Sequence, residues 1–490
     1  MSTVLIRGAK VLDPDLPLVE RDVAIADGRI IDITQSKRVD SSATVVDATG
    51  MVVMPGLVNA HTHSGQSLDR GVAGNLPLDM WMMWVVYGGV HFDIEDRYTL
   101  ALTGALEMLK AGCTSVLDHS FVAVDGFEDT VEAVLSAYSD AGMRVGLAPM
   151  ISDKAFFDSM PSLAGIKKPD SVSQPASSRE LLDLMERFLQ VWTGRSSLVT
   201  PMVGPSAPQR CTEDLLLGLG ALSNRFAAPV HTHVNETASQ VRALREHDGR
   251  SATEVLAEAG LLTERTSLAH GVWLDRSDFE RIREARATVV HNPVSNLRLG
   301  SGLMPLAGML EGGVSVAIGT DGGASNDSQN MFEAMKFGTL IHTLTGRPES
   351  WPTAEQVWGA GLKGGAQAMT AKVGSISVGS KADLVLISLD RHIANDRTRL
   401  VQSLVMADQG QSVDSVMVGG EFVVREGQSV RIDEKAFRDA SHALRLRIDD
   451  QWRTRQSTLD DHSEYLAAIQ DDTEGADIGI ERRAEITPAF

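Results

Sequence analysis

The chain has 490 residues, 43% of them hydrophobic, and a formal net charge of −20, so it can bury the core of a large domain plus an accessory domain. The negative charge argues against a nucleic-acid or anionic-membrane surface, because such surfaces need clustered Lys and Arg. There is no signal-peptide core, no apolar run long enough to span a bilayer, and no disulfide framework in Cys113 and Cys211, so we expect a cytoplasmic protein.

Short strands with turn signals are expected at both ends of the chain. Strand-like Val4-Leu5-Ile6 precedes Gly8, and residues 22–25 lead into a hairpin-type turn at Asp27-Gly28. A similar pattern returns at residues 382–387 and 415–420. We therefore expect residues 1–54 and 371–430 to form one β-sandwich from both chain ends.

Residues 55–370 alternate helix-like and strand-like segments. Residues 98–111 carry leucines at helical spacing, and Gly112 ends this helix before a strand at 114–118. Further strands are expected at 144–147, 199–203, 229–233, 267–270, 288–291 and 314–320. Repeated βα units of this length predict a parallel barrel or a doubly wound sheet, and in a barrel the chemistry lies at the C-terminal ends of the strands.

The last part of the chain, residues 431–490, is rich in charge. Residues 433–455 can form an amphipathic helix, whereas the stretch from 457 onward is acidic with little periodicity. We expect a solvated or partly disordered tail there, with an arm that packs on another subunit as the alternative.

Histidines stand at the ends of several expected strands. His61 and His63 follow the segment that Pro55-Gly56 introduces. Because side chains alternate along a strand, both imidazoles lie on one face. Two neutral imidazoles on one face suit Zn²⁺ or Fe²⁺.

Three more strand ends supply candidate groups. His231 and His233 repeat the His-x-His spacing, so the spacing alone leaves open which of them binds metal. Glu236 lies just past that strand, where a carboxylate can serve a metal-bound water, and His270 and Asp321 end later strands. Four such strand ends in register with the βα pattern indicate a metal site in place of isolated polar groups.

With these motifs, the chain resembles metal-dependent amidohydrolases, in the subgroup of the cytosine, guanine, 8-oxoguanine and methylthioadenosine/S-adenosylhomocysteine deaminases and of atrazine chlorohydrolase. The supporting segments are PGLVNAHTH (55–63), HTHVNET (231–237), LAH (268–270), HNPVSNLRLGSG (291–302) and GTDGGASNDSQNMFEAMKF (319–337). The resemblance covers nearly the whole chain up to about residue 430. It implies an α/β fold, a (β/α)₈ TIM barrel with a β-sandwich domain, and a hydrolase of C–N bonds.

The resemblance also implies residue roles. The metal ligands would be His61, His63, His233 and Asp321. The catalytic groups would be Glu236 as proton shuttle, Asp321, and His270, which contacts the metal-bound water or joins the metal in some members; His231 is not a ligand in that pattern. Binuclear members place a bridging lysine in the fourth strand, and residues 198–208 contain none, so we expect one divalent ion per chain, Zn²⁺ with Fe²⁺ as the alternative.

The loop after His63, residues 64–91, should overhang the site. Trp81 and Trp84 in this loop either form a wall for a flat ring or belong to a helix that packs on the barrel. The other candidate substrate contacts, for each of which a purely structural role stays open, are His119, Gln209, Arg210, Asn296 and Ser325.

We expect a hydrolytic deaminase of an aminated N-heterocycle of purine, pyrimidine, pterin or triazine type. The alternative is a triazine dechlorinase or N-dealkylating amidohydrolase, or a urea or carbamate hydrolase. Gly322 follows Asp321 where the dechlorinating members carry Asn, which favours the purine-type pattern. A non-enzymatic scaffold is disfavoured because all the ligands are present. The expected partners are a small heterocyclic substrate and further copies of the chain, with no nucleic acid and no membrane.

Overall fold

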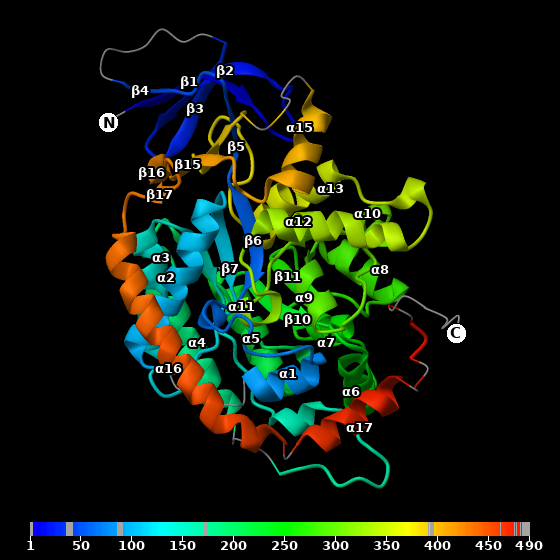
Figure 1. Cartoon of the computed structure of the whole chain (residues 1–490). Coiled ribbons are helices and arrows are strands. Elements are labelled where there is room, and N and C mark those ends of the chain that lie inside the picture. Colours follow the sequence, from blue (N-terminus) through cyan, green and yellow to red (C-terminus); the bar gives the residue numbers. More distant parts are fainter. Residues whose placement is uncertain are drawn as a thin grey trace.

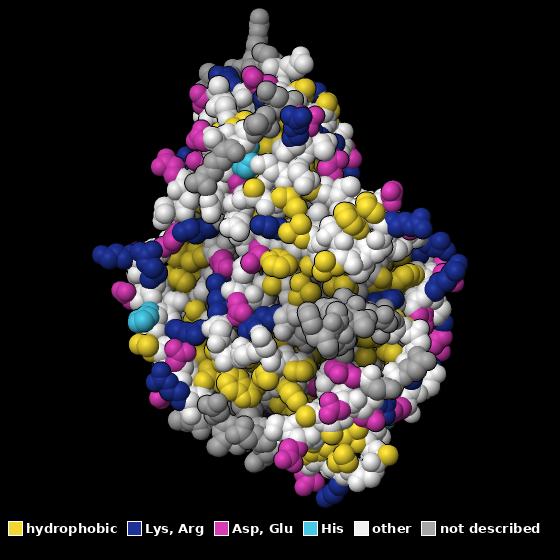
Figure 2. Space-filling model, turned by 45° about the vertical axis from the view of Figure 1, so that its right-hand side comes forward, with side chains coloured by type: hydrophobic (Ala, Val, Ile, Leu, Met, Phe, Trp, Pro, Cys, Tyr) yellow, Lys and Arg dark blue, Asp and Glu magenta, His cyan; other side chains and the backbone are white. Residues whose placement is uncertain are grey.

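The computed structural model describes residues 3–35, 43–85, 92–170, 175–390, 392, 396–460, 462–474, 476, 478–480 and 482, with side chains omitted at 454–460. A sheet of strands from the chain ends lies above a larger body of strands and helices (Figure 1). On the face in Figure 2, the sheet forms the narrow upper part, and basic and acidic side chains are interspersed over the surface.

The terminal strands form one nine-stranded sheet in the order β17-β16-β15-β14-β5-β1-β2-β3, with β4 paired to β1. The strands are β1 (Val4–Val11), β2 (Val19–Ala26), β3 (Arg29–Thr34), β4 (Thr44–Asp47), β5 (Met51–Pro55), β14 (Leu384–Ser388), β15 (Val413–Val418), β16 (Glu421–Arg425) and β17 (Gln428–Ser429). The antiparallel pairing of β14 with β5 joins the two chain ends, and Ile6 and Val23 share a buried cluster with Leu384 and Met417. Both chain ends therefore contribute strands to one common sheet, as the expected sandwich requires.

The first strand is longer than its sequence indicates. The expected strand stopped before Gly8, but β1 continues to Val11 through a register shift between Ile6 and Ala9. Gly8 has φ +73°, which glycine adopts without steric cost, and an added Cβ would lie 2.9 Å from Thr49 Oγ1. The glycine is thus a bulge inside the strand.

The body contains two four-stranded parallel sheets among the described residues, ordered β6-β7-β8-β9 and β10-β11-β12-β13. The strands are β6 (Leu57–Thr62), β7 (Cys113–Asp118), β8 (Arg144–Leu147), β9 (Val199–Pro201), β10 (Val230–Val234), β11 (Thr266–His270), β12 (Thr288–His291) and β13 (Ser315–Ile318). A parallel bridge between Val203 and Val230 follows β9 and joins the two sheets. At the other edge, Asp321 N donates to His61 O over 2.9 Å. All eight strands match expected segments.

Helices alternate with these strands and surround them (Figure 1). They are α1 (Leu78–Val85), α2 (Ile94–Lys110), α3 (Phe127–Ala141), α4 (Ser178–Trp192), α5 (Glu213–Phe226), α6 (Ala238–Asp248), α7 (Ala252–Glu258), α8 (Arg276–Ala285), α9 (Pro293–Arg298), α10 (Leu306–Glu311), α11 (Gly323–Asn326), α12 (Met331–Leu340), α13 (Ala354–Gly359), α14 (Gly365–Ala368) and α15 (Arg397–Ser403). The helix expected from residue 98 begins four residues earlier, because Asp93 and Asp96 form a capping box at its N-terminus.

Two further helices follow the terminal sheet. α16 (Glu434–Asp460) runs past α2, and α17 (Ser463–Glu474) lies against α1 and α6 (Figure 1). The expectation of a solvated tail is wrong for α17, because Tyr465, Leu466 and Ile469 are buried. Their spacing makes a short apolar stripe that the acidic composition around it concealed. None of the helices that the structure describes combines the length and hydrophobicity needed to cross a bilayer.

Candidate metal and active site

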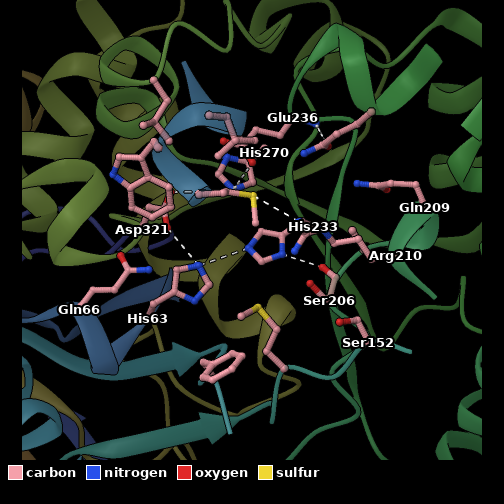
Figure 3. A pocket seen from close by; sticks show the side chains of 18 residues that line it. His63, Gln66, Ser152, Ser206, Gln209, Arg210, His233, Glu236, His270 and Asp321 are labelled. Atoms are coloured by element: carbon pink, nitrogen blue, oxygen red, sulfur yellow. Dashed lines mark hydrogen bonds and ion pairs between the residues drawn. The ribbon is translucent and has the colours of Figure 1, made fainter. Parts of the chain in front are cut away.

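Side chains at the C-terminal ends of the parallel strands converge on one point. His61 lies on β6 and His63 just beyond it, His233 lies on β10, His270 ends β11, and Asp321 follows β13. Two groups, His61/His63/His233 and His61/His270/Asp321, each place their ligand atoms within 4.8 Å of one another. Figure 3 shows His63, His233, His270 and Asp321 directed toward a shared centre.

Backbone carbonyls orient two of these imidazoles. His63 Nδ1 donates to the carbonyl oxygen of His119 over 2.6 Å, and His233 Nδ1 donates to that of Ser206 over 2.7 Å. A carbonyl oxygen only accepts, so each Nδ1 carries the hydrogen and each neutral ring presents a lone pair at Nε2. The two Nε2 atoms lie 3.3 Å apart. Two lone pairs face each other there, an arrangement that a shared cation would stabilise.

A chain of hydrogen bonds orients the third imidazole. His61 Nδ1 lies 2.8 Å from His231 Nε2, and His231 Nδ1 lies 2.7 Å from Ser267 Oγ, which donates to the Val230 carbonyl over 3.2 Å. When His61 donates, each following donor has an acceptor, and His61 Nε2 is left with a free lone pair. That atom is buried and has no hydrogen-bond partner among the residues that the structure describes. In this network His231 supports the ring of His61, which favours His233 over His231 as the candidate ligand.

Burial favours the neutral form of three of these histidines. Burial lowers the pKa of His61 to about 4, and burial with the neighbouring imidazoles lowers the pKa of His233 and His231 well below the usual range. A third histidine group, His61/His119/His231, also has ligand atoms within 4.8 Å, but the bond between His61 and His231 occupies two of them. The Nε2 atoms of His61, His63 and His233, which no protein donor occupies among the described residues, therefore form the set that fits a divalent cation.

Asp321 supplies an anion to the same centre. Its Oδ1 lies 3.4 Å from Nε2 of both His61 and His63 and accepts from Gly322 N over 2.7 Å. Its Oδ2 accepts from Ser295 Oγ over 2.5 Å. Burial works to raise the pKa of Asp321, but the adjacent His61, followed by His63 and His270, holds that pKa well below its usual value, so the group is a carboxylate.

Glu236 differs from Asp321 in its protonation. It is 4% exposed, and burial raises its pKa to about 7 against the opposing effect of His270. Its Oε1 accepts from Ser301 Oγ over 3.3 Å, and its Oε2 lies 3.7 Å from His270 Nε2. Two carboxyl groups with opposite pKa shifts in one site can divide acid and base work.

His270 is oriented by Asn296, a residue expected from the sequence as a candidate substrate contact. His270 Nδ1 donates to Asn296 Oδ1 over 2.9 Å, which directs Nε2 toward Glu236 and Asp321. Asn235, His270 and Asp321 have positive φ values of 47°, 73° and 66°. Such backbone strain in non-glycine residues persists only where surrounding contacts enforce it, and it is concentrated at functional sites.

A cavity of about 740 Å³, partly open to solvent, adjoins the cluster. Three of the expected substrate contacts, Trp81, Gln209 and Arg210, line it, beside His63, His233, Glu236, His270 and Asp321 (Figure 3). The Trp81 indole N–H donates to the Ala324 carbonyl over 3.2 Å, so its ring is fixed as a wall.

The structure places the other four expected contacts outside this lining. Trp84 stacks on Trp452, with ring centres 5.1 Å apart at 11°. His119 is fully buried behind His233, and its ring stacks on that histidine at 4.8 Å. Asn296 orients His270, and Ser325 Oγ donates to the Gly322 carbonyl. Substrate contact by these four side chains stays a prediction; in the structure each of them packs on, or hydrogen-bonds to, another part of the protein.

Several lining residues were missed, namely Gln66, Ser152, Ser206 and Gln240. Gln66 is the most informative of these about what the cavity could bind. Its Oε1 is buried and has no hydrogen-bond partner in the described part of the chain. A Cβ added at Gly322 would lie 1.9 Å from this oxygen, so the glycine leaves the space that Gln66 occupies. The position of Gln66 three residues after His63 was the available signal.

Comparison with known proteins agrees with this geometry. The model of the amidohydrolase family matches residues 52–423. The 5'-deoxyadenosine deaminase of Methanosarcina acetivorans is 32% identical over 443 residues, which cover 89% of this chain and 96% of that protein. The 5-methylthioadenosine/S-adenosylhomocysteine deaminase of Pelotomaculum thermopropionicum is 32% identical over 460 residues, 91% and 99% of the two chains. The solved adenosine deaminase of Xanthomonas campestris with bound zinc has a TM-score of 0.80 at 26% identity, covering 92% and 98%.

Proposed function

The chain belongs to the amidohydrolase family, and on that premise we propose that it is a metal-dependent hydrolase that deaminates an adenine-containing nucleoside. It acts on a C–N bond other than a peptide bond and releases ammonia from an aminated N-heterocycle. The observation that carries the proposal is the set of three fixed imidazole lone pairs and one carboxylate beside a cavity that opens to solvent. The names of the relatives, all deaminases of adenosine derivatives, support the purine class.

We propose His61, His63, His233 and Asp321 as the ligands of one divalent ion, zinc by analogy with the zinc-containing neighbour. A bound cation supplies Lewis acidity, which makes water a nucleophile near neutral pH. His231, through His61, and the carbonyls that hold His63 and His233 keep the donors in place.

The protein's own groups move the protons in this proposal. Glu236, protonated near neutral pH, donates to the ring nitrogen beside the amino-bearing carbon, which makes that carbon more electrophilic. Asp321, a carboxylate, accepts a proton from the attacking water and passes it to the amino group, which leaves as ammonia, while the proton of the new hydroxyl group returns to Glu236. His270 lies between these two carboxyl groups and hydrogen-bonds the attacking oxygen. Trp81 bounds the cavity that receives the ring.

The finer architecture is also a proposal. The bridge after β9 and the contact between Asp321 and His61 support closure of the eight parallel strands into a (β/α)₈ barrel, with the terminal sheet folded as a sandwich. We divide the chain into 1–54 and 371–430 (sandwich), 55–370 (barrel) and 431–490 (C-terminal helices). A cytoplasmic location stays a prediction, which the two free and buried cysteines support. A homo-oligomer also stays a prediction.

Ammonia release from a panel of heterocycles tests the function. The panel contains adenosine, 5'-deoxyadenosine, methylthioadenosine, guanine, cytosine and a chloro- and an alkylamino-triazine. We expect turnover of the adenine nucleosides and one zinc per chain. Halide or alkylamine release from the triazines without adenosine turnover would instead support the alternative, a triazine hydrolase. Two tightly bound ions per chain would contradict the single-ion proposal.

A further inference from the structure

The helix α1 forms one wall of the cavity but has little support of its own. It spans eight residues, and Leu78, Trp81 and Met82 line the cavity. Isolated helices shorter than about 12–15 residues are marginal in water, so tertiary contacts determine where α1 lies. The position of α1 sets where Trp81 and Met82 lie in the cavity, and Met82 Sδ accepts there from Arg210 Nη2 over 3.6 Å.

Contacts on the outer side of α1 come from the C-terminal arm, which we define as the described residues from 434 to 482. On α16, Trp452 stacks on Trp84 of α1 and is 6% exposed. On α17, Leu466 and Ile469 share a buried cluster with Met83 of α1. Both helices of the arm therefore contact α1, through Trp84 and Met83, which do not line the cavity, and Figure 1 shows α17 close to α1.

The arm also supports the neighbouring parts of the cavity. Arg445 of α16 donates to the carbonyls of Leu68 and Arg70, in the loop that follows His63. Phe156 belongs to the cluster with Leu466 and lies 5.3 Å from the guanidinium of Arg210, a cavity residue. The family match ends at residue 423, so these contacts are made by a segment that lies beyond the matched part of the chain.

We propose that the C-terminal arm determines substrate specificity by fixing α1, and with it Trp81, as a wall of the cavity. The arm contributes no group to the proposed metal site, so it acts on substrate fit and leaves the chemical step to other residues. This inference rests on the proposed deaminase function for its kinetic consequences, but its structural consequence, the position of α1, does not depend on the reaction.

The experiment uses the full-length zinc protein with Trp452→Ala and Leu466→Ala. The matched control is Leu446→Ala, since Leu446 lies on α16 and is 56% exposed. We expect KM for adenosine to rise about tenfold or more in both variants while kcat stays within about threefold. The differences in kcat/KM among adenosine, 5'-deoxyadenosine and methylthioadenosine should become smaller. Zinc content should stay at the wild-type value, and Trp452→Phe should restore most of the lost affinity.

Hydrogen exchange supplies the readout that is independent of activity. Peptides covering residues 76–85 should exchange faster in Trp452→Ala and Leu466→Ala, whereas peptides from β10 should not. Should these variants fail to fold, Tyr465→Ala, which removes an edge contact with Phe157 at 5.7 Å, is the milder substitute. The inference would be overturned by unchanged hydrogen exchange in α1. It would also be overturned if the variants lost zinc and their kcat fell by as large a factor as their KM rose. Absence of turnover in the wild type would defeat only the proposed function.

Discussion

The ring nitrogens of three histidines carry most of the argument at the scale of single residues. His61, His63 and His233 each use Nδ1 to donate to a group outside the cluster, so each Nε2 lone pair faces the centre. Burial keeps the rings of His61 and His233 neutral. The same burial has opposite consequences for the two carboxyl groups, because Asp321 faces histidines whereas Glu236 lies mainly in a desolvated position.

Replacement of Glu236 by Gln tests its proton-transfer role. The amide keeps the size of the side chain but cannot titrate, and general acid–base catalysis contributes about 10²–10⁴-fold, so kcat should fall by at least that order. Metal content should stay near wild type, because no proposed ligand is lost. Both quantities are measured on one preparation. Full activity would remove Glu236 from the mechanism, and metal loss would reassign it as a ligand.

His61 and His231 should differ in their effect on metal binding. His61→Ala removes a proposed ligand and should abolish activity and most zinc binding. His231→Ala removes only the acceptor that holds the His61 ring, and loss of such a partner costs about 10–100-fold in metal affinity. Competition with a chromophoric chelator measures both constants. Wild-type affinity in His231→Ala would show that the hydrogen bond to His61 is unimportant.

At the scale of elements, the C-terminal helix α16 closes over a buried carboxyl group. Asp69 lies between the 3₁₀ turn at Ser64–Gln66 and α1, and it is 4% exposed. Burial raises its pKa to about 6, although Arg445 and Arg97 act in the opposite direction. Packing of α16 onto this loop therefore desolvates an acid that is ionised at neutral pH in the unfolded chain.

Asp69→Asn should stabilise the protein at alkaline pH. The folded pKa is raised from 3.8 to about 6, so the carboxyl favours folding below pH 4 and this contribution is lost as the pH rises through 6. This difference between the folded and unfolded pKa values corresponds to at most ~3 kcal/mol of folding free energy. The neutral amide should recover part of that free energy at pH 8 and none of it at pH 4. Thermal unfolding at both pH values is the measurement, with exposed Asp170→Asn as control. Equal effects at both pH values would contradict the assignment.

At the scale of the whole molecule, one buried ion pair joins the parallel-strand body to the terminal sheet. Arg144 of β8 makes two hydrogen bonds to Asp383, at 2.8 and 3.0 Å, and both side chains are at most 3% exposed. Arg144 also donates to the Ser197 carbonyl, and Asp383 accepts from Gly419 N. This pair ties strands that are more than two hundred residues apart in the chain.

Asp383→Ala should destabilise the whole protein. Removal of one partner leaves a buried guanidinium unpaired, which typically costs about 3–5 kcal/mol. Glu128→Ala breaks the ion pair with Arg187, whose side chains are 52% and 61% exposed, and such pairs contribute about 0–1 kcal/mol. The melting temperatures of the zinc proteins give the comparison. Equal shifts in the two variants would contradict a joining role for Arg144 and Asp383.

Local sequence patterns were enough to predict the parallel strands and to identify the candidate reactive side chains. The parallel strands were predicted from local alternation of strand-like and helix-like segments, and His61, His63, His233, Glu236 and Asp321 were recognised because they follow those strands at short, regular spacing. Local periodicity suffices for this, since strand direction and the face of a side chain are set by neighbours in the chain.

Contacts between side chains that are far apart in the sequence became visible only in the folded protein. Trp84 was a candidate cavity wall, but Trp452, hundreds of residues later, stacks on it. Asn296 turned out to orient His270, and Gln66 occupies space that Gly322 leaves free. The direction in which such a side chain points depends on packing between distant segments. Composition and spacing carry no record of that packing, because the same short stretch can face a cavity or a helix according to what covers it.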